Sequence, residues 1–320
     1  MARYPDTFII GAPKSGTTSL YEYLKGHPDV FMPAVKEPTY FAPDLPPNTS
    51  EHMLRFGPDH DVYLELFAGA GEARRIGEAS VRYMSSRVAP GLIRDFQPRP
   101  FIVAALRNPV DMVHSLHAHR VAGGTEDLID LEAALEAEED RRAGRRIPPN
   151  SNAARSVYTD RARYGEQLER WFNAFGPERI HVIIFEEMVR QPAESFHRLL
   201  EFLGVDPNYQ PPDFRAHNPR HATRSRLLRS LLHSRPPQWL VWTLMPRVLG
   251  EQRTRSLVRS FRHSRLHRRP ARHLAMPEHV RRRLESEFAP DVVRLSRLLG
   301  RDMGQAWWGR SVPGQAPRHE

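Results

Sequence analysis

The sequence predicts an α/β fold in which a P-loop-like parallel sheet is flanked by helices on both faces. Three stretches carry this prediction, because each reads as a short apolar strand followed by a helix, and they begin near residues 7, 101 and 179. Strands that alternate with helices in this way pair in parallel, with the helices packed against the sheet. The 320 residues are enough to bury one large core of this kind.

The first unit begins with a β-rich run, Thr7 to Ile10, and enters a glycine turn at residues 11–18, GAPKSGTT. Apolar residues at helical spacing follow from Ser19 to Gly26. The backbone amides and the dipole at the start of such a helix favour an anion, and Lys14 adds a positive charge. The residues that we expect to form this oxyanion-binding loop are Lys14, Ser15, Gly16, Thr17, Thr18 and Ser19.

The second unit is the apolar run Phe101 to Leu106, which is followed by a helical stretch from Val110 to Val121. Between the two stand Arg107, Asn108 and Pro109, and the proline suits the first turn of the helix. Arg107 therefore directly follows a predicted strand.

The third unit is a strand from Arg179 to Phe185 and a helix from Ala193 to Leu203, preceded by a helix from Tyr158 to Phe175. The stretch Leu131 to Arg146, which comes before it, is charged and helix-prone. Two interpretations of that stretch stay open, a solvated surface excursion and a lid on the substrate side.

The net charge of +9 and the absence of cysteine bound the classes of function. The charge favours anionic ligands or surfaces, and the lack of cysteine excludes disulfides, thiolate nucleophiles and cysteine metal sites. Residues 1–10 lack the layout of a secretory signal, and no apolar run reaches the roughly 20 residues of a membrane-spanning helix. We therefore expect a soluble, cytoplasmic protein.

Three regions are expected along the chain: an α/β core at residues 1–210, an arginine-rich helical segment at 211–305 that packs on the core, and a disordered tail at 306–320. Arginine is dense from Arg215 to Arg283, and the short apolar run Trp239 to Met245 interrupts it. Solvated helix faces explain this composition, and peripheral contact with a membrane surface is the alternative.

The glycine turn differs from the nucleotide-binding P-loop pattern G-x-x-x-x-G-K-[ST]. Gly11 and Gly16 have the required spacing, but the lysine comes earlier, at Lys14, and Thr17 holds its usual place. The stretch PKSGTTSL, residues 13–20, resembles the 5′-phosphosulfate loop of the sulfotransferase superfamily. This resemblance implies that 3′-phosphoadenosine 5′-phosphosulfate is the donor and that Lys14 contributes to catalysis.

A second resemblance lies at the end of the second predicted strand. Leu106-Arg107-Asn108-Pro109 with Ser115 is similar to the superfamily's 3′-phosphate element, in which an arginine and a serine hold the ribose 3′-phosphate. The resemblance extends from about Tyr4 to Val205, with a weaker echo from residue 217 to 228. Related enzymes close the adenosine site with a basic loop near that echo, and both Arg220 and Arg224 remain candidates.

A third resemblance concerns the catalytic base. KEPTYF, residues 36–41, is similar to a stretch of heparan-type and related bacterial sulfotransferases, which implies that Glu37 takes the proton of the acceptor hydroxyl. A histidine is the base in the superfamily's cytosolic small-molecule branch, so His114 and His117 stay as alternatives. GEASVRY, residues 77–83, departs from the glycosaminoglycan-modifying members at Ala79 and Val81, which argues against an anionic polysaccharide acceptor.

The function predicted from these patterns is in-line transfer of a sulfuryl group to a hydroxyl of a carbohydrate, glycolipid or other small molecule, without a metal. A P-loop kinase or nucleotide triphosphatase is one alternative, which requires lysine directly after Gly16 and an acidic magnesium ligand. A basic protein that binds nucleic acid or membrane is the other, although no nucleic-acid partner is expected from the motifs.

Overall fold

The computed structural model describes residues 4–46, 59–148, 151–214 and 276–312, together with the backbone of two short paired strands, β6 (His221–Thr223) and β7 (Arg268–Pro270). The candidates Arg220 and Arg224, the run Trp239–Met245 and residues 313–320 lie outside the described residues. No helix among those described is both long and apolar enough to cross a membrane.

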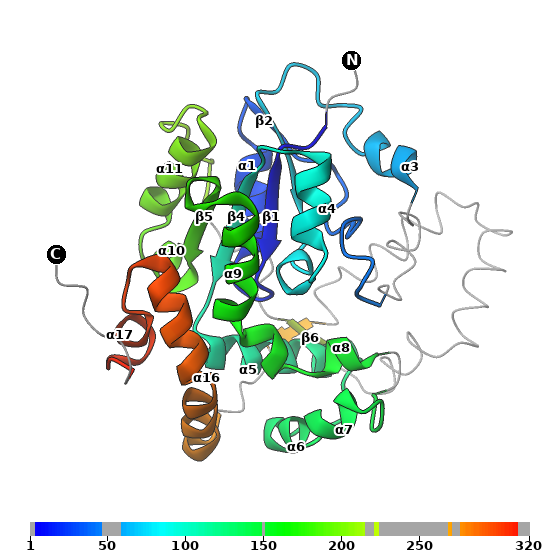
Figure 1. Ribbon diagram of the computed structural model, residues 1–320, viewed down its shortest axis with the longest axis vertical. Coiled ribbons are helices and arrows are strands. Elements are labelled where there is room, and N and C mark those ends of the chain that lie inside the picture. Colours follow the sequence, from blue (N-terminus) through cyan, green and yellow to red (C-terminus); the bar gives the residue numbers. More distant parts are fainter. Residues whose placement is uncertain are drawn as a thin grey trace, which may run out of the picture.

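A five-stranded parallel sheet forms the centre of the molecule (Figure 1). Its strands lie in the order β2-β3-β1-β4-β5, and every neighbouring pair is parallel. They are β1 (Thr7–Gly11), β2 (Val30–Phe31), β3 (Arg75–Ala79), β4 (Phe101–Leu106) and β5 (Ile180–Ile184). The predicted P-loop-like fold is therefore confirmed.

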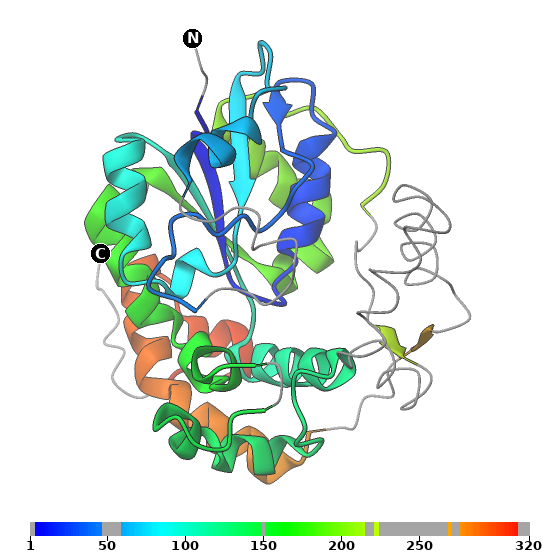
Figure 2. The same cartoon turned by 90° about the vertical axis from the view of Figure 1, so that its right-hand side faces the viewer.

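Helices cover both faces of the sheet because side chains of the central strand alternate in direction. Phe8 and Ile10 of β1 pack in one buried cluster with residues of α4 (Ala89–Phe96) and α9 (Tyr164–Phe175). Ile9 packs in another cluster with residues of α1 (Thr17–Lys25) and α11 (Pro192–Leu203). Figure 2 shows α4 and α1 on opposite sides of the strands.

The remaining helices surround this layered centre and the end of the sheet below it in Figure 1. They are α3 (His60–Glu65), η1 (Tyr83–Ser85), α5 (Pro109–Gly123), α6 (Leu131–Glu136), α7 (Glu138–Arg142), α8 (Ala153–Ser156), η2 (Thr159–Ala162), η3 (Pro177–Arg179), α10 (Phe185–Arg190), α16 (Glu278–Leu299) and α17 (Met303–Trp308).

The long helix expected from Tyr158 is divided into η2 and α9, because Arg163 takes a non-helical conformation between them. Two backbone amides of the first turn of α9, those of Gly165 and Glu166, donate to the Asp291 carboxylate at 2.8 and 2.9 Å. Since Asp291 belongs to α16, this helix fixes the start of α9.

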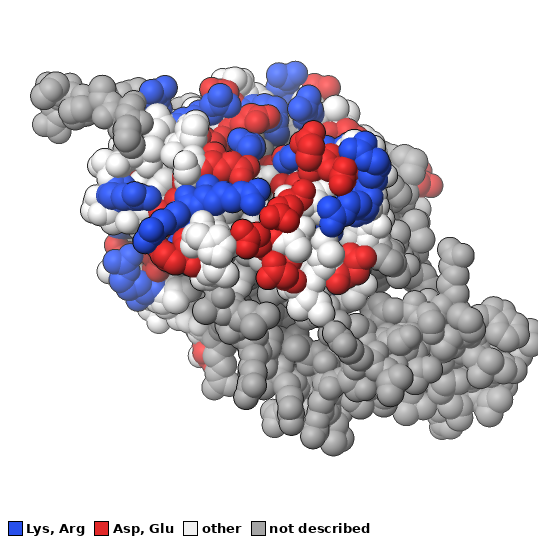
Figure 3. All heavy atoms as spheres, turned by 90° about the horizontal axis from the view of Figure 1, so that it is seen from below, with Lys and Arg blue, Asp and Glu red and all other residues white. Residues whose placement is uncertain are grey.

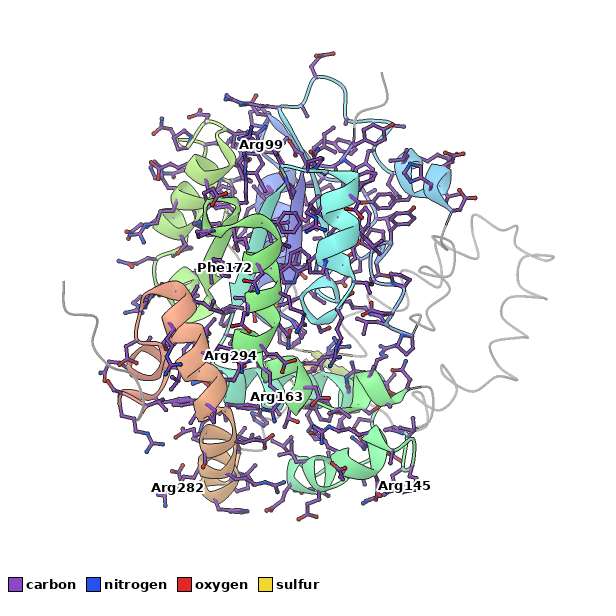
Figure 4. All side chains as sticks on the ribbon, viewed as in Figure 1. Arg99, Arg145, Arg163, Phe172, Arg282 and Arg294 are labelled. Atoms are coloured by element: carbon purple, nitrogen blue, oxygen red, sulfur yellow. The ribbon has the colours of Figure 1, made fainter. Side chains whose placement is uncertain are left out.

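Ion pairs and close backbone contact hold α16 along α9. Arg163 pairs with Glu287 at 3.2 Å and Arg294 with Glu169 at 3.9 Å, and both arginines are labelled on these neighbouring elements in Figure 4. The predicted boundary at residue 306 falls inside α17, whose Trp307 indole N–H donates to Glu186 at 3.2 Å. Residues 306–312 therefore belong to the described structure.

The stretch Leu131–Arg146 is not a fully solvated excursion. Arg141 of α7 is completely buried and forms two hydrogen bonds, each 2.8 Å long, with the carboxylate of Glu126. Glu138 is also buried, and it accepts the backbone N–H groups of Tyr158 and Thr159. These helices therefore fix the position of the segment that leads into η2.

The close packing of α9 on α16 yields a stability prediction. A Cβ at Gly165 would lie 2.4 Å from the backbone oxygen of Asp291 and 2.9 Å from the backbone nitrogen of Leu295. Gly165→Ala should therefore lower the free energy of unfolding by about 1–3 kcal/mol, as overpacking does elsewhere. Denaturant titration measures this change.

The matched control is Gly91→Ala within α4, where an added Cβ meets no atom within 4 Å. Alanine favours a helix over glycine, so this variant should keep or gain up to about 1 kcal/mol. Equal stability of the two variants would contradict the close packing described for α9.

Candidate functional site

A cavity of about 730 Å³ lies where the loops leave the carboxyl ends of the strands. This edge of an open parallel sheet is where ligands bind in α/β proteins, beside the point at which strand order reverses. The predicted site residues that line the cavity are Lys14, Gly16, Thr17, Thr18, Ser19, Glu37, Arg107 and Ser115. Ser15 is fully buried beneath the loop, with its hydroxyl 3.4 Å from the Pro13 carbonyl oxygen.

The oxyanion-binding loop takes a backbone shape that glycine makes possible. Gly16 caps α1 at φ 82°, and a Cβ there would lie 2.4 Å from Met188 Cε and 3.1 Å from the Phe185 ring. Lys14 also has a positive φ, 62°. The helix therefore starts at Thr17 with its free amides directed to the cavity, and Met188 and Phe185 leave no room for a larger residue at position 16.

Arg107 and Ser115 present unpaired polar atoms on the neighbouring wall. The Arg107 guanidinium lies 4.9 Å over the Phe185 ring and donates to the Lys14 carbonyl oxygen at 3.4 Å. Its Nε and the Ser115 hydroxyl are buried, and neither has a hydrogen-bond partner among the described residues. Buried donors without partners cost free energy, so these two atoms fit a ligand that would accept from both.

Helix α17 supports the wall that carries Arg107. The Asn108 side-chain oxygen caps α5 by accepting the Val110 amide at 3.1 Å. The Asn108 backbone N–H donates to the Glu186 carboxylate, and its side-chain NH₂ group donates to the Trp307 carbonyl oxygen. Glu186 also accepts the Trp307 indole N–H. Packing of α17 therefore fixes the residue that follows Arg107.

Lys36 is a second cation at the loop, and the sequence analysis assigned it no role. Its ammonium group lies 3.2 Å from the Thr18 hydroxyl, 3.5 Å from the Thr17 hydroxyl and 3.4 Å from the Glu37 carboxylate. Its position directly before Glu37 in the KEPTYF stretch could have indicated that Lys36 lies at the site. Lys36 therefore connects the oxyanion-binding loop to Glu37.

Backbone contacts with β3 hold Glu37 at the cavity. The Glu37 amide donates to the Ala79 carbonyl oxygen at 2.9 Å, and the Thr39 amide donates to the Ser80 hydroxyl at 3.1 Å. Glu37 and Thr39 adopt positive φ values of 64° and 55°, which few non-glycine residues do outside constrained sites. The loop is therefore held in a single, costly conformation that presents the Glu37 side chain.

A buried carboxyl supports that loop from beneath. Glu78 of β3 accepts hydrogen bonds from Tyr63 at 2.6 Å, Tyr83 at 3.1 Å and Ser80 at 2.6 Å. Its complete burial raises the pKa of Glu78 from 4.5 to about 7, although these three hydrogen bonds act in the other direction. Because Ser80 in turn receives the Thr39 amide, Glu78 positions the Glu37 loop without contacting the cavity.

Two of the three histidines on α5 lie away from the cavity lining. The His117 ring is buried against Tyr158, with Nε2 2.9 Å from the Leu128 carbonyl oxygen, and His114 is not among the lining residues. His119, which the sequence analysis did not select, does line the cavity. Burial, followed by the charges of Lys14 and two arginines, lowers the pKa of His119 to about 4, so its ring is neutral at pH 7.

Four arginines that the sequence analysis did not select also line the cavity: Arg82, Arg120, Arg155 and Arg161. We call them the arginine cluster. They come from the turn before η1, from α5, from α8 and from η2, so their proximity is a product of the fold. Motif reading could not find them in a chain that is rich in arginine from residue 74 onward.

The fold is that of a P-loop-like α/β protein, and cationic and hydroxyl side chains from several of its elements line one cavity. The sequence model of the sulfotransferase domain family matches residues 4–218 of the chain. The chain therefore belongs to the sulfotransferase domain family, and it is an enzyme of the sulfuryl-transfer class.

Known proteins that resemble the chain agree with this assignment. Bifunctional heparan sulfate N-deacetylase/N-sulfotransferase 1 of Xenopus laevis is 27% identical over 205 residues, which are 63% of this chain and 22% of that protein. Type 3 of Homo sapiens is 27% identical over 214 residues, 65% of this chain and 23% of that protein. The chain thus spans less than a quarter of these curated relatives.

A solved structure matches over almost the whole length. The crystal structure of a sulfotransferase from Alicyclobacillus acidocaldarius has a TM-score of 0.71 and 29% sequence identity, and the match covers 96% of this chain and 99% of that one. The fold of the described residues is therefore a sulfotransferase fold.

The raised pKa of Glu78 yields a prediction for stability against pH. Between pH 4.5 and about 7 the unfolded chain loses this proton before the folded chain does, so the stability of the protein should fall as pH rises through that window. Glu78→Gln removes the titration. As the pH rises from 4.5 to about 7, the unfolding free energy of Glu78→Gln should therefore increase relative to that of the parent by up to about 3 kcal/mol.

Thermal or denaturant unfolding at several pH values measures this difference. Glu65→Gln, on the exposed end of α3, is the control and should show no comparable trend. A Glu78→Gln difference that stays constant from pH 4.5 to 7 would contradict a carboxyl held neutral by burial.

Proposed function

We propose that the chain transfers a sulfuryl group from 3′-phosphoadenosine 5′-phosphosulfate to a hydroxyl, with the donor bound between the oxyanion-binding loop and the Arg107 wall. The observation that carries this proposal is the pair of buried, unpartnered donors, Arg107 Nε and Ser115 Oγ, in the same cavity as the loop. A 3′-phosphate is the group of the donor that would satisfy both atoms.

The loop fits the other phosphate of the donor. Amides at the start of α1 and the hydroxyls of Thr17 and Thr18 supply hydrogen bonds, and Lys14 and Lys36 supply positive charge. Negative charge grows on the bridging oxygen and the 5′-phosphate as the sulfur–oxygen bond breaks. Donors and cations fixed at that point stabilise the transition state more than the ground state, and we propose that no divalent metal is needed for it.

Glu37 is the proposed general base. Its carboxylate lines the cavity beside Lys36, which also contacts the loop, so an acceptor hydroxyl next to Glu37 would face the sulfur of a bound donor. Removal of the hydroxyl proton by a positioned base contributes roughly 10²- to 10⁴-fold. His119 is the histidine alternative that the cavity offers, because its ring is neutral at pH 7.

The class of acceptor we propose is a hydroxyl-bearing carbohydrate or glycolipid. The support is similarity to proteins named for heparan sulfate, a glycan, and the similarity covers only the matched portion of those proteins. We further propose a cytoplasmic location, with the arginine-rich carboxyl-terminal segment as the part that would contact a membrane surface.

The first functional prediction tests the donor site. Adenosine 3′,5′-bisphosphate should bind more tightly than AMP by about tenfold or more, since the 3′-phosphate adds charge-assisted hydrogen bonds worth roughly 1.5–3 kcal/mol. Calorimetry in the presence of a chelator measures both affinities. Arg107→Ala should remove the preference for the bisphosphate while leaving AMP binding nearly unchanged.

Arg99→Ala is the matched control, because Arg99 is exposed and lies far from the cavity at the opposite end of the sheet (Figure 4). It should bind both ligands as the parent does. Equal affinity of the parent for AMP and the bisphosphate would overturn the assignment of Arg107 and Ser115.

A second functional prediction tests the base. Glu37→Gln keeps the size of the side chain but cannot accept the proton, so turnover should fall by roughly 10² or more while the affinity for adenosine 3′,5′-bisphosphate stays close to that of the parent. Transfer of labelled sulfate measures turnover, and calorimetry measures affinity. Near-normal turnover in Glu37→Gln together with collapse in His119→Gln would move the base to the histidine.

A further inference from the structure

The arginine cluster is an unusual concentration of buried positive charge. Arg82, Arg120 and Arg161 have exposed fractions of 6, 7 and 7%, and Arg155 is half-buried beside them. The Nε atoms of Arg82 and Arg120 are buried without a hydrogen-bond partner among the described residues. Buried charges in proteins are normally paired, so this arrangement calls for a partner.

Nearby carboxylates do not supply that partner. None of the four arginines forms an ion pair with a carboxylate of the described residues, and the hydrogen bonds of Arg82 and Arg161 go to backbone carbonyl oxygens. Glu126 is close in space, but Arg141 and the Tyr158 hydroxyl already occupy its carboxylate oxygens. Within the described lining, the one carboxylate is that of Glu37.

Arginines on the outer surface behave differently. Figure 3 shows blue and red side chains interspersed over the face of the molecule seen from below. Arg145 pairs with Asp140 at 2.7 Å and Arg282 with Glu278 at 3.0 Å, and many other described surface arginines pair in the same way. The cavity thus differs from this surface in that several arginines gather there, mostly buried, without a carboxylate partner among the described residues.

The guanidinium groups of the cluster disfavour one another's charge. Burial, followed by the positive charges of neighbouring arginines, lowers the pKa of Arg161 to about 9 and that of Arg120 to about 10. Burial also lowers the pKa of Arg82 and Arg155. An anion placed among these groups would relieve the repulsion and supply the missing hydrogen-bond acceptors.

The two phosphates of the donor do not need this cluster. The oxyanion-binding loop and the Arg107 wall supply the phosphate contacts in the proposed function. Arg82, Arg155 and Arg161 lie on other elements, and Arg120 lies on α5 five residues after Ser115. Glu37 links the two regions, since it contacts Lys36 at the loop and its charge acts on both Arg82 and Arg161. The cluster thus shares the cavity with the proposed base, so an acceptor hydroxyl beside Glu37 would lie near it.

We propose that the arginine cluster binds an anionic group carried by the acceptor, so that the substrate has a carboxylate, sulfate ester or phosphate near the hydroxyl that is modified. This inference rests on the proposed function and narrows its acceptor class. Planar guanidinium groups from four segments of the chain that line one cavity suit an oxyanion with several acceptor lone pairs. The anion would hold the acceptor in place while Glu37 faces its hydroxyl.

The sequence differs from the glycosaminoglycan-modifying sulfotransferases at Ala79 and Val81, which argued against an anionic polysaccharide acceptor. In this proposal, arginines at other positions supply the positive charge for an anionic group. Arg82 lies three residues after Ala79, and the remaining members come from α5, α8 and η2. Arg141 donates to the Ser156 carbonyl oxygen at 3.0 Å, so the buried pair with Glu126 fixes the segment that carries Arg155. The position of Arg155 at the cavity is thus fixed by this buried ion pair.

The test measures binding of simple anions while the donor site is filled. The protein is saturated with adenosine 3′,5′-bisphosphate, and sodium sulfate, sodium phosphate or sodium acetate is titrated at constant ionic strength against a chloride reference. Binding of at least one of the three oxyanions is expected, and the preferred anion identifies the acceptor group. Arg120→Met should weaken this binding by about tenfold, the effect of one lost charge-assisted contact.

Two further variants complete the design. Arg155→Gln, at a less buried position, should weaken anion binding in the same direction and replaces Arg120→Met if that variant fails to fold. Arg282→Met removes the same charge from the outer surface and should leave anion binding unchanged. The affinity for adenosine 3′,5′-bisphosphate should be the same in all four proteins.

The outcomes separate this inference from the proposed function. Failure of adenosine 3′,5′-bisphosphate to bind the parent would overturn both. Normal binding of the bisphosphate with no oxyanion binding above the chloride reference, or with equal oxyanion binding in Arg120→Met, Arg155→Gln and Arg282→Met, would overturn the acceptor subsite and leave the donor site intact.

Discussion

The parallel pairing of the five strands is the constraint on which the site depends. Each strand ends at the same edge of the sheet, so the loops that follow them converge although they are far apart in sequence. Lys14 follows β1, Glu37 follows β2, Arg82 follows β3, Arg107 follows β4 and Phe185 follows β5. A strand that ran the other way would carry its functional residue to the opposite end of the molecule.

Arginines occur in two kinds of environment in this protein. On the outer surface many described arginines are paired with carboxylates, as Arg145 is with Asp140. Within the cavity the described arginines lack such partners, and the surroundings hold them in place by packing and by hydrogen bonds to backbone oxygens. Charge left uncompensated in a partly water-excluded site is available to bind oxyanions and to stabilise charge that develops during transfer.

The sequence was sufficient for the parts of the fold and site that short segments determine. The strand before the glycine turn, the strand before Arg107 and the helices after them were predicted to within a few residues, because apolar runs and glycine or proline mark their ends. β3 was missed, since it contains Gly77 and a buried Glu78, whose burial is compensated by hydrogen bonds from Tyr63, Ser80 and Tyr83. The arginine cluster was missed for a related reason, as its members share no spacing and their meaning lies in the absence of carboxylates around them.

In the proposed function, one cavity holds both phosphates of an adenosine 3′,5′-bisphosphate unit. A crystal structure of the protein with this nucleotide would locate both groups. The 5′-phosphate is expected within hydrogen-bond distance of the amides at Gly16 and Thr17, and the 3′-phosphate on Arg107 Nε and the Ser115 hydroxyl. A nucleotide bound elsewhere, or bound with its 3′-phosphate away from Arg107 and Ser115, would overturn the proposed donor site.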